Sequence, residues 1–95
     1  MSLIASHPYI KVERHVTGLE QKQIEHERYI HLYRDKVVTK YHEFPLSQVM
    51  DMSYRSIGNK GGLLYLHTNK GVYTYPVKST PRKFIDSFKL VNEGY

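Results

Sequence analysis

The sequence predicts a mainly β fold with a C-terminal helix, built from about six to seven antiparallel strands. Three observations lead to this fold class. Nine tyrosines and many β-branched residues favour strands. Several short segments alternate apolar and polar side chains, and the last segment changes to a spacing of about 3.6 residues. We therefore expect the strands to come first and a single amphipathic helix to come last.

The length limits the chain to one domain. A chain of 95 residues supplies one modest core, so residues 1–95 are interpreted as a single domain, with residues 1–7 as a flexible lead-in or partly a cloning remnant. No run of about 18 apolar residues is present, which argues against a transmembrane segment, and the N-terminus lacks the apolar core of a signal peptide. The absence of cysteine removes disulfides, thiolate zinc sites and a cysteine nucleophile. These features suit a cytoplasmic protein.

The N-terminal part predicts one strand and leaves the next segment open. Residues 8–16 alternate well enough for a first strand, and Thr17 and Gly18 break the pattern. The polar residues 19–27 fit either a helical turn or a loop. The residues that follow are predicted to return to strand.

The next segment predicts a β-hairpin over residues 28–44. Ile30 and Leu32 fall on one face of its first strand, residues 28–33. After a short polar connection, residues 37–44 alternate again and supply the second strand.

Pro45 is expected to end that strand because proline has no N–H to donate to a ladder. The next residues predict a turn or a single helical turn that brings Leu46 and Val49 to the core. Residues 49–55 alternate and predict a further strand.

Residues 63–68 and 72–78 give the clearest hairpin signal. The loop between them ends at Gly71, and three-residue loops commonly combine a type I turn with a residue at positive φ, which glycine adopts readily. Pro76 suggests an edge strand. The ideal register of this loop places Tyr65 opposite Tyr75, His67 opposite Tyr73 and Leu63 opposite Val77 on one face, with Leu64, Leu66, Val72, Thr74 and Pro76 on the other.

The last segment predicts the helix. Ser79 or Thr80 is a suitable cap, and Pro81 suits the first helical position. Gly94 is expected to end the helix. One apolar stripe follows at helical spacing and consists of Phe84, Ile85, Phe88 and Val91.

Positive charge gathers in the C-terminal third. Residues 1–54 are balanced, whereas residues 55–89 contain seven Lys or Arg and one Asp, and the whole chain carries +5. Such a surface attracts nucleic acid, anionic lipid or an acidic partner, or it serves only as a solvated surface. The candidates for contact with an anionic ligand are Arg55, Lys60, Lys70, Lys78, Arg82 and Lys83.

Two Asn-Lys-Gly tripeptides, at residues 59–61 and 69–71, raise the question of a phosphate loop. A Walker-type loop needs a Ser or Thr after the lysine and a helix behind it, and "GNKGG" has neither. Both are therefore interpreted as connections between strands. Lys60 and Lys70 remain available at loop tips as point charges for anions.

The remaining site types receive little support. None of the six histidines forms an H-x-x-x-H pair, so no metal or other cofactor is predicted. No nucleophile context is recognisable, so the protein is predicted not to be an enzyme and to have no catalytic residues.

The tyrosines of the last hairpin have two interpretations: an aromatic platform of the kind that stacks nucleic-acid bases, or ordinary cross-strand tyrosine pairs. The candidate residues for the platform are Tyr65, His67, Tyr73 and Tyr75.

From about Ile30 onward, the sequence resembles a pleckstrin-homology-like (PH-like) domain of the small bacterial type. The resemblance rests on "YIHLYRDKVVTKYHEFPLSQVMDMSYR", "GGLLYLHTNKGVYTYPV" and "STPRKFIDSFKLV". It implies a bent β-barrel or sandwich capped by the helix of Phe84 and Phe88. Because this fold is a scaffold for many ligands, the expected function is a non-catalytic binding module with a basic surface. A protein or peptide is expected to dock at a strand edge or a strand–helix groove, with self-association through a strand edge as one form.

A second resemblance gives the alternative function. The segment "FPLSQVMDMSYRS" and the hairpin and helix that follow are similar to the front half of a LytTR-type DNA-binding domain. That resemblance implies a transcriptional regulator domain whose basic residues contact phosphates. The DNA-contacting elements that follow in that family have no counterpart before Tyr95. Steep salt dependence of binding would separate this function from docking at a strand edge.

Overall fold

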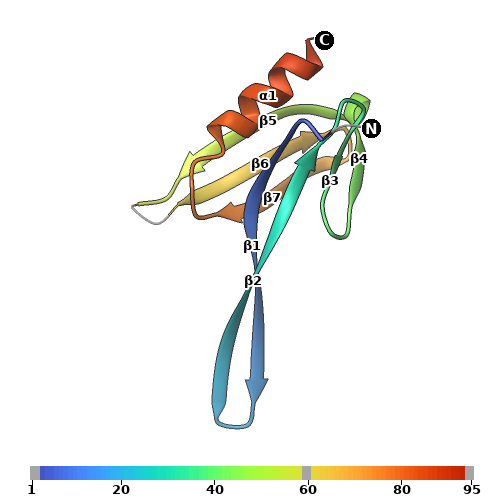
Figure 1. Ribbon diagram of the computed structural model, residues 1–95. Helices are drawn as coiled ribbons and strands as arrows, with labels where there is room; N and C mark the ends of the chain where they lie inside the picture. Colours follow the sequence, from blue (N-terminus) through green and yellow to red (C-terminus); the bar gives the residue numbers. More distant parts are fainter. Residues whose placement is uncertain (1–2, 59–60, 94–95) are drawn as a thin grey trace.

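The computed structural model describes residues 3–58 and 61–93, which form seven strands in two antiparallel sheets and a C-terminal helix (Figure 1). The first sheet has the order β1 (Ala5–Thr17), β2 (Glu20–Leu32), β3 (Lys36–Val38) and β4 (Glu43–Pro45). A 3₁₀ turn, η1 (Leu46–Gln48), leads to the second sheet, whose order is β5 (Val49–Ser56), β6 (Gly62–Thr68) and β7 (Gly71–Val77). The chain then enters α1 (Arg82–Asn92). The predicted fold class is confirmed.

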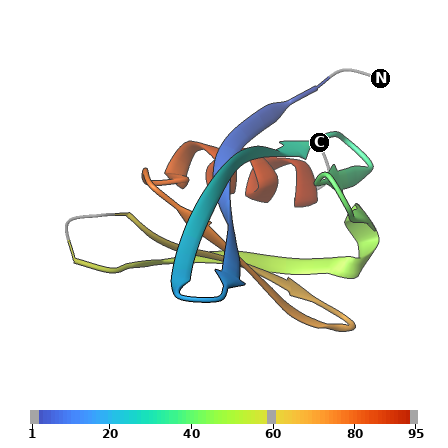
Figure 2. The same cartoon turned by 90° about the horizontal axis from the view of Figure 1, so that it is seen from below.

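One hydrophobic core lies between the sheets and the helix. Within the described residues no hydrogen-bonded ladder joins the two sheets, so the body is a sandwich, with α1 lying against β5 and β1 (Figure 2). No helix in the described ranges has the length and apolar character needed to cross a membrane. The core consists of Tyr9, Ile30, Leu32, Val37, Phe44, Val49, Met52, Leu64, Leu66, Tyr75, Val77, Phe84 and Phe88.

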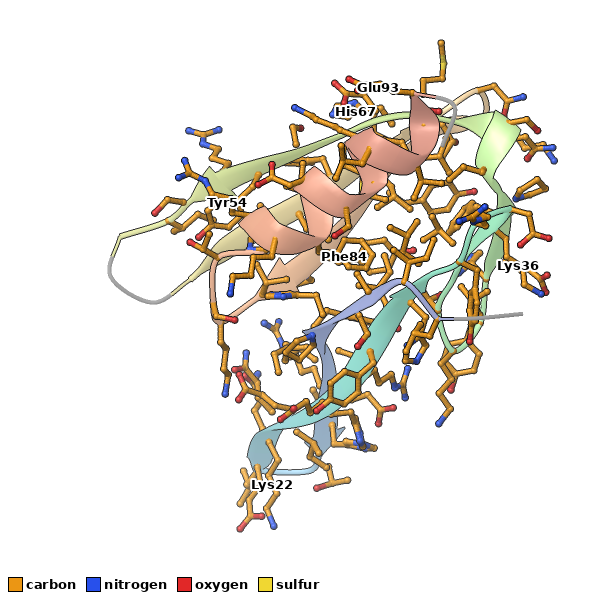
Figure 3. The ribbon with its side chains drawn as sticks, turned by 45° about the horizontal axis from the view of Figure 1, so that its top comes forward. Lys22, Lys36, Tyr54, His67, Phe84 and Glu93 are labelled. Carbon is orange, nitrogen blue, oxygen red and sulfur yellow. The ribbon has the colours of Figure 1, made fainter. Side chains whose placement is uncertain are left out.

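The helix confirms the predicted apolar stripe. Phe84 and Phe88 are buried, and Phe84 points from α1 into the interior (Figure 3). Ile85 and Val91 pack against the core. The predicted cap is wrong. Pro81 occupies the N-cap, no side chain caps the helix, and the Ile85 N–H donates to the Pro81 carbonyl at 2.9 Å. The expected end at Gly94 lies outside the described residues.

The segment 19–27 is neither a helical turn nor a loop. It is the first part of β2, which pairs with β1 from Ala5 opposite Leu32 to Thr17 opposite Glu20. Gly18, at φ 57°, forms the turn between them. Residues 5–7, expected to belong to a flexible lead-in, are the first residues of β1. The apolar alternation is missing in 19–27 because this part of the hairpin projects beyond the body (Figure 1), in a molecule that measures 54 × 27 × 24 Å.

The predicted strand over residues 37–44 is wrong, because a tight turn divides it into β3 and β4. The Thr39 N–H donates to the His42 carbonyl at 2.8 Å, and the Thr39 hydroxyl accepts the His42 N–H at 3.1 Å. These bonds satisfy a buried threonine locally, and its neighbours Val37 and Phe44 then pair across the turn. The predictions for the next residues are confirmed: η1 brings Leu46 and Val49 to the core, and β5 follows.

The hairpin of β6 and β7 exists as predicted, but its register differs by one residue. Thr68 pairs with Gly71, so Leu64 faces Tyr75 and Leu66 faces Tyr73. Gly71 has the expected positive φ, 129°. It is also the first residue of the ladder, because the Thr68 hydroxyl donates to its carbonyl at 2.8 Å. A shift of one residue moves every side chain of a strand to the other face. Pro76 lies on an edge strand, as predicted.

Candidate functional site at the β1–β2 hairpin

The outer part of the β1–β2 hairpin is a two-stranded ribbon that we call the arm, residues 11–26. Most of its side chains are exposed on both faces. Lys22 lies near its far end, well away from Phe84 in the core (Figure 3). Its exposed side chains include several large apolar ones, on both faces of the ribbon. These are Val12, Val16, Leu19 and Ile24, and Leu19 is fully exposed at 106%.

The edge of β2 on the side away from β1 is free over most of its length. On that side β3 pairs only with His31 and Leu32. Among the described residues, no other strand neighbours β2, and no further backbone hydrogen bond reaches residues 20–30. Every second residue of this stretch therefore directs an N–H and a carbonyl away from the sheet. Such an edge is a template for pairing with another chain.

A groove lies next to this edge, between β2 and the turn of residues 39–42. It has a volume of about 560 Å³ and is open to solvent. Its wall is polar and carries charges of both signs. The lining residues are Glu25, His26, Glu27, Arg28, Tyr29, His31, Thr39 and Lys40. An added strand would have room beside β2 at this point.

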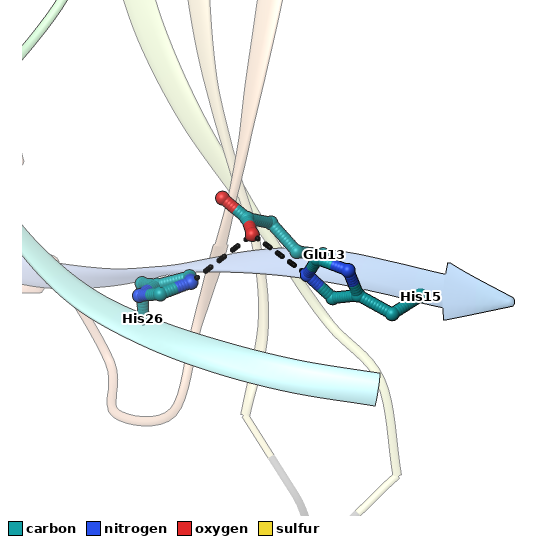
Figure 4. Close-up of polar contacts among 3 residues, drawn as sticks. All are labelled: Glu13, His15 and His26. Carbon is teal, nitrogen blue, oxygen red and sulfur yellow. Dashed lines mark hydrogen bonds and ion pairs between the residues drawn. The ribbon is translucent and has the colours of Figure 1, made fainter. Parts of the chain in front are cut away.

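The core-side face of the arm carries a small network of ionisable groups (Figure 4). Glu13 Oε2 lies 3.3 Å from His15 Nε2 and 3.4 Å from His26 Nε2. The hydrogen bond from His15, followed by the charge of His26, holds the pKa of Glu13 below its ordinary value. Within residues 3–58 and 61–93, no group of His, Cys, Asp or Glu has the arrangement of a metal site. The network therefore acts as a link between the two strands of the arm.

The proposed aromatic platform does not form, because the register shift separates its members. Tyr73 and Tyr75 lie on the core face: Tyr75 is 8% exposed and packs edge-on against Tyr9 at 5.0 Å between ring centroids. Tyr65 and His67 lie on the opposite face, where His67 Nε2 is 2.7 Å from the hydroxyl of Ser53. The expectation that all four share a face is wrong.

Burial has a further effect on Tyr75. Its hydroxyl is enclosed, makes no hydrogen bond of good geometry, and has the Thr39 side chain as its polar neighbour. Burial raises its pKa to about 12, because an ionised phenolate is poorly solvated in the core. The group is a structural one and takes no part in the candidate site.

The predicted basic residues are divided between two ends of the second sheet. Arg55 and Lys78 lie at the end where β5 and β7 finish, and Arg82 and Lys83 begin α1 nearby. Lys70 lies in the turn at the other end, roughly 20 Å away at about 3.3 Å per residue. Lys60 lies outside the described residues. Lys78 is also paired with Glu25 of the arm at 3.2 Å, so part of the predicted positive charge is compensated.

The strand–helix groove is present between β5 and α1. Its volume is about 750 Å³. Its lining carries charges of both signs: Arg82 and Lys89 are positive, and Asp51 and Asp86 are negative. This groove has no net charge to select an anionic ligand, and α1 covers part of the β5 edge.

The second strand of the arm could not be predicted from an apolar pattern, because its residues lack a buried face. The available signal was Gly18, a residue suited to the positive φ of a tight turn, between two stretches of similar length. A two-residue connection at Gly18 and Leu19 joins them. Pairing across that turn would have predicted a long hairpin.

Comparisons with known proteins do not assign the chain to a family. No protein-family model matches it, and no curated protein matches it.

Proposed function

We propose that the protein is a non-catalytic interaction module of the PH-like type, which docks an extended protein segment along the free edge of β2. The observation that carries this proposal is the unpaired stretch from Glu20 to Ile30. An extended segment placed there would receive main-chain hydrogen bonds from β2 and would add a strand to the first sheet.

The stability of the arm supports the same proposal. A two-stranded ribbon with both faces in water is marginally stable by itself, whereas a third strand stabilises it. The arm has this exposed geometry beyond the body, and its ion pairs among the described residues are the Glu13 network, Glu20–Lys22 and Glu25–Lys78. Surface ion pairs contribute little. A docked strand would therefore bind to the arm and also stabilise its ribbon structure.

The order of elements supports the PH-like part of the proposal. A four-stranded sheet is followed by a three-stranded sheet and a C-terminal helix. Phe84 and Phe88 face the core, as the resemblance implies. Because one such scaffold serves many ligands, the docking surface is argued from the arm and not from the fold.

Selection of peptides tests this function. Peptides selected from a random displayed library would be added to isotopically labelled protein, and amide shifts would be followed by NMR. We expect shifts and slowed exchange at the odd-numbered amides between Glu20 and Ile30, which alternate in phase with the Tyr33 N–H that donates to β3. Binding should be weaker in Gln23→Pro, which removes one of these donors. Pro substitution at Met50, an exposed residue at the bulge of β5, is the matched control. Shifts confined to the β5–α1 groove would contradict the proposal.

A second candidate is contact with an anionic polymer such as DNA. The observation that favours it is the presence of Arg55, Lys78, Arg82 and Lys83 at one end of the second sheet. The pairing of Lys78 with Glu25 leaves this function with less support than docking at β2. Retention of a DNA duplex that falls log-linearly with salt would favour it. Retention that is absent at low salt would exclude it.

A further inference from the structure

We propose that the segment docked on β2 is β2 of a second copy of this chain, paired antiparallel about a two-fold axis that passes through Ile24. This inference rests on the proposed function and adds the identity of the docked strand and its register. The argument comes from the charges along β2, the apolar tip of the arm and the length of the free edge.

Symmetry restricts the registers available to such a pair. When two identical antiparallel strands extend one sheet, residues directly opposite each other lie on the same face, so the two-fold axis must pass through a residue and its copy. Even-numbered residues of β2 share the face that carries Ile30 in the core, and odd-numbered residues share the other. Each register is therefore specified by the residue at its centre.

The register centred on Ile24 matches every charge with an opposite or neutral partner. Glu20 faces Arg28 of the second copy, and Lys22 faces His26 of the second copy. On the other face, Gln21 and Gln23 face the second copy's Glu27 and Glu25. Ile24 meets its own copy at the axis, so two exposed apolar side chains are buried together.

The other registers that overlap over much of the free edge are less favourable. Centres at Lys22, Glu25, Glu27 or Arg28 place that residue opposite its own copy, like charge against like charge. A centre at His26 places Glu25 opposite Glu27. A centre at Gln23 avoids such clashes, but it places Lys22 opposite Ile24 and leaves Arg28 without an acidic partner. Like charges directly opposite one another destabilise a sheet, so the charge pattern selects Ile24.

The tip of the arm fits the same register. Leu19, in the turn next to Glu20, comes to lie near Tyr29 of the second copy, and these side chains are 106% and 48% exposed in the isolated chain. Strand pairing runs from Glu20 to Arg28 on each copy and stops before His31, where β3 already occupies the edge. The groove between β2 and Thr39 and Lys40 lies at this end of the edge. The paired stretch therefore lies within the free length, and the free β2 edge of each copy is used by the other in a closed two-fold contact.

Cross-linking through single introduced cysteines tests the register, since the chain has no cysteine of its own. In the proposed pair the Cα atoms at position 24 lie about 5 Å apart, within the range that a disulfide bridges. At positions 23 and 25 the same atoms lie about 8 Å apart, beyond that range. We expect Ile24→Cys to form a disulfide-linked dimer at several times the yield of Gln23→Cys and Glu25→Cys. We also expect this preference to disappear in denaturant.

Charge reversal tests the pairing without any cross-link. Arg28→Glu places like charges opposite each other twice in a dimer and is expected to weaken association about tenfold or more. Combining Arg28→Glu with Glu20→Arg restores both opposite pairs and is expected to recover most of the affinity. Sedimentation equilibrium measures the association, and circular dichroism checks that each variant is folded.

The outcomes separate this inference from the proposed function. A cross-linking maximum at position 23 or 25, equal yields at all three positions, or failure of the double reversal to recover association would overturn the inference. A chain that stays monomeric while selected peptides still dock along Glu20–Ile30 would also overturn it, but would leave the proposed function standing. If neither a second copy nor a peptide docks on β2, both proposals fail.

Discussion

The two parts of β2 contrast with each other although they belong to one continuous strand. In the body, Ile30 and Leu32 are completely buried beneath the second sheet. In the arm, residues 20–25 are all exposed. Both parts pair with β1 in one uninterrupted register. The comparison shows that pairing across the Gly18 turn determines where the strand is, whereas packing of other elements determines which residues are buried.

This contrast gives the two regions different roles. The body supplies nearly all of the apolar burial, because the core residues of β1 to β7 and α1 meet there. The arm supplies backbone hydrogen-bonding groups and exposed apolar side chains. Substitutions in the body should therefore change stability, and substitutions in the arm should change association.

The largest difference is expected between Phe88→Ala and Leu19→Ala. Phe88 is 1% exposed, so its truncation leaves a cavity and should lower the free energy of unfolding by about 3–5 kcal/mol. Leu19 is fully exposed, and its truncation should change stability by no more than about 0.5 kcal/mol. Urea unfolding of both variants, at concentrations where the wild type is monomeric, measures the two values. Equal losses would contradict the division between body and arm.

The next effect is alkaline destabilisation through Tyr75. Its pKa is about 12 in the folded protein and near 10 when unfolded. Stability is therefore complete below pH 10 and falls as the pH rises toward 12, by about 1–2 kcal/mol after allowance for solvent screening. Tyr75→Phe should remove this loss and change stability little at neutral pH, because the hydroxyl makes no hydrogen bond of good geometry. Tyr41→Phe, at an exposed turn residue, is the control and should keep the alkaline loss.

A smaller contrast is expected between two glycines. A Cβ at Gly62 would collide with the Arg55 carbonyl and approach the Tyr54 ring, so Gly62→Ala should cost about 1–3 kcal/mol as an overpacked site does. At Gly18 the space is open, but φ is 57°, so Gly18→Ala should cost about 1 kcal/mol from backbone strain alone. Thermal unfolding compares the two. A larger loss at Gly18 would indicate that the turn contributes more than the close packing of β5 and β6.

The smallest effect concerns the Glu13 network of the arm. Because its pKa is lowered in the folded protein, the carboxylate contributes stability above its ordinary value of 4.5 and loses that contribution as the pH falls through the lowered pKa. Amide protection in the arm, measured relative to the intrinsic exchange rate at each pH, should therefore fall in acid while protection in the core stays high. Glu13→Gln should accelerate exchange in the arm at neutral pH and flatten this dependence, whereas Glu20→Gln should leave the dependence in place.

The sequence predicted the body better than the arm for a physical reason. The helix of Phe84 and Phe88 and the turn at Leu46 could be predicted because each must bury apolar atoms, and this leaves an apolar pattern in the sequence. The arm buries almost no side chains, so residues 19–27 show no alternation of apolar and polar residues from which a strand could be predicted. Its free edge depends on where β3 ends, which is set by the local bonds of Thr39 and His42 and not by the pattern of β2.

The error in the register of β6 and β7 has a different origin. Gly71 was expected from its conformation to belong to the loop, and its φ is indeed positive. Its backbone nevertheless pairs with Thr68. This difference of one residue places Tyr73 and Tyr65 on opposite faces of the hairpin, so the predicted aromatic platform does not form. Loop chemistry alone does not decide between adjacent registers, whereas the burial of Tyr75 and Val77 does.

Amide hydrogen exchange along β2, measured over a range of protein concentrations, tests the role of the arm most directly. The account predicts that alternate amides between Glu20 and Ile30 exchange fast in dilute solution and become protected as concentration rises. Arg28→Glu should lose this protection, while the amides of β6 should not change in either protein. Exchange in β2 that is independent of concentration, or protection that appears equally in Arg28→Glu, would contradict the account.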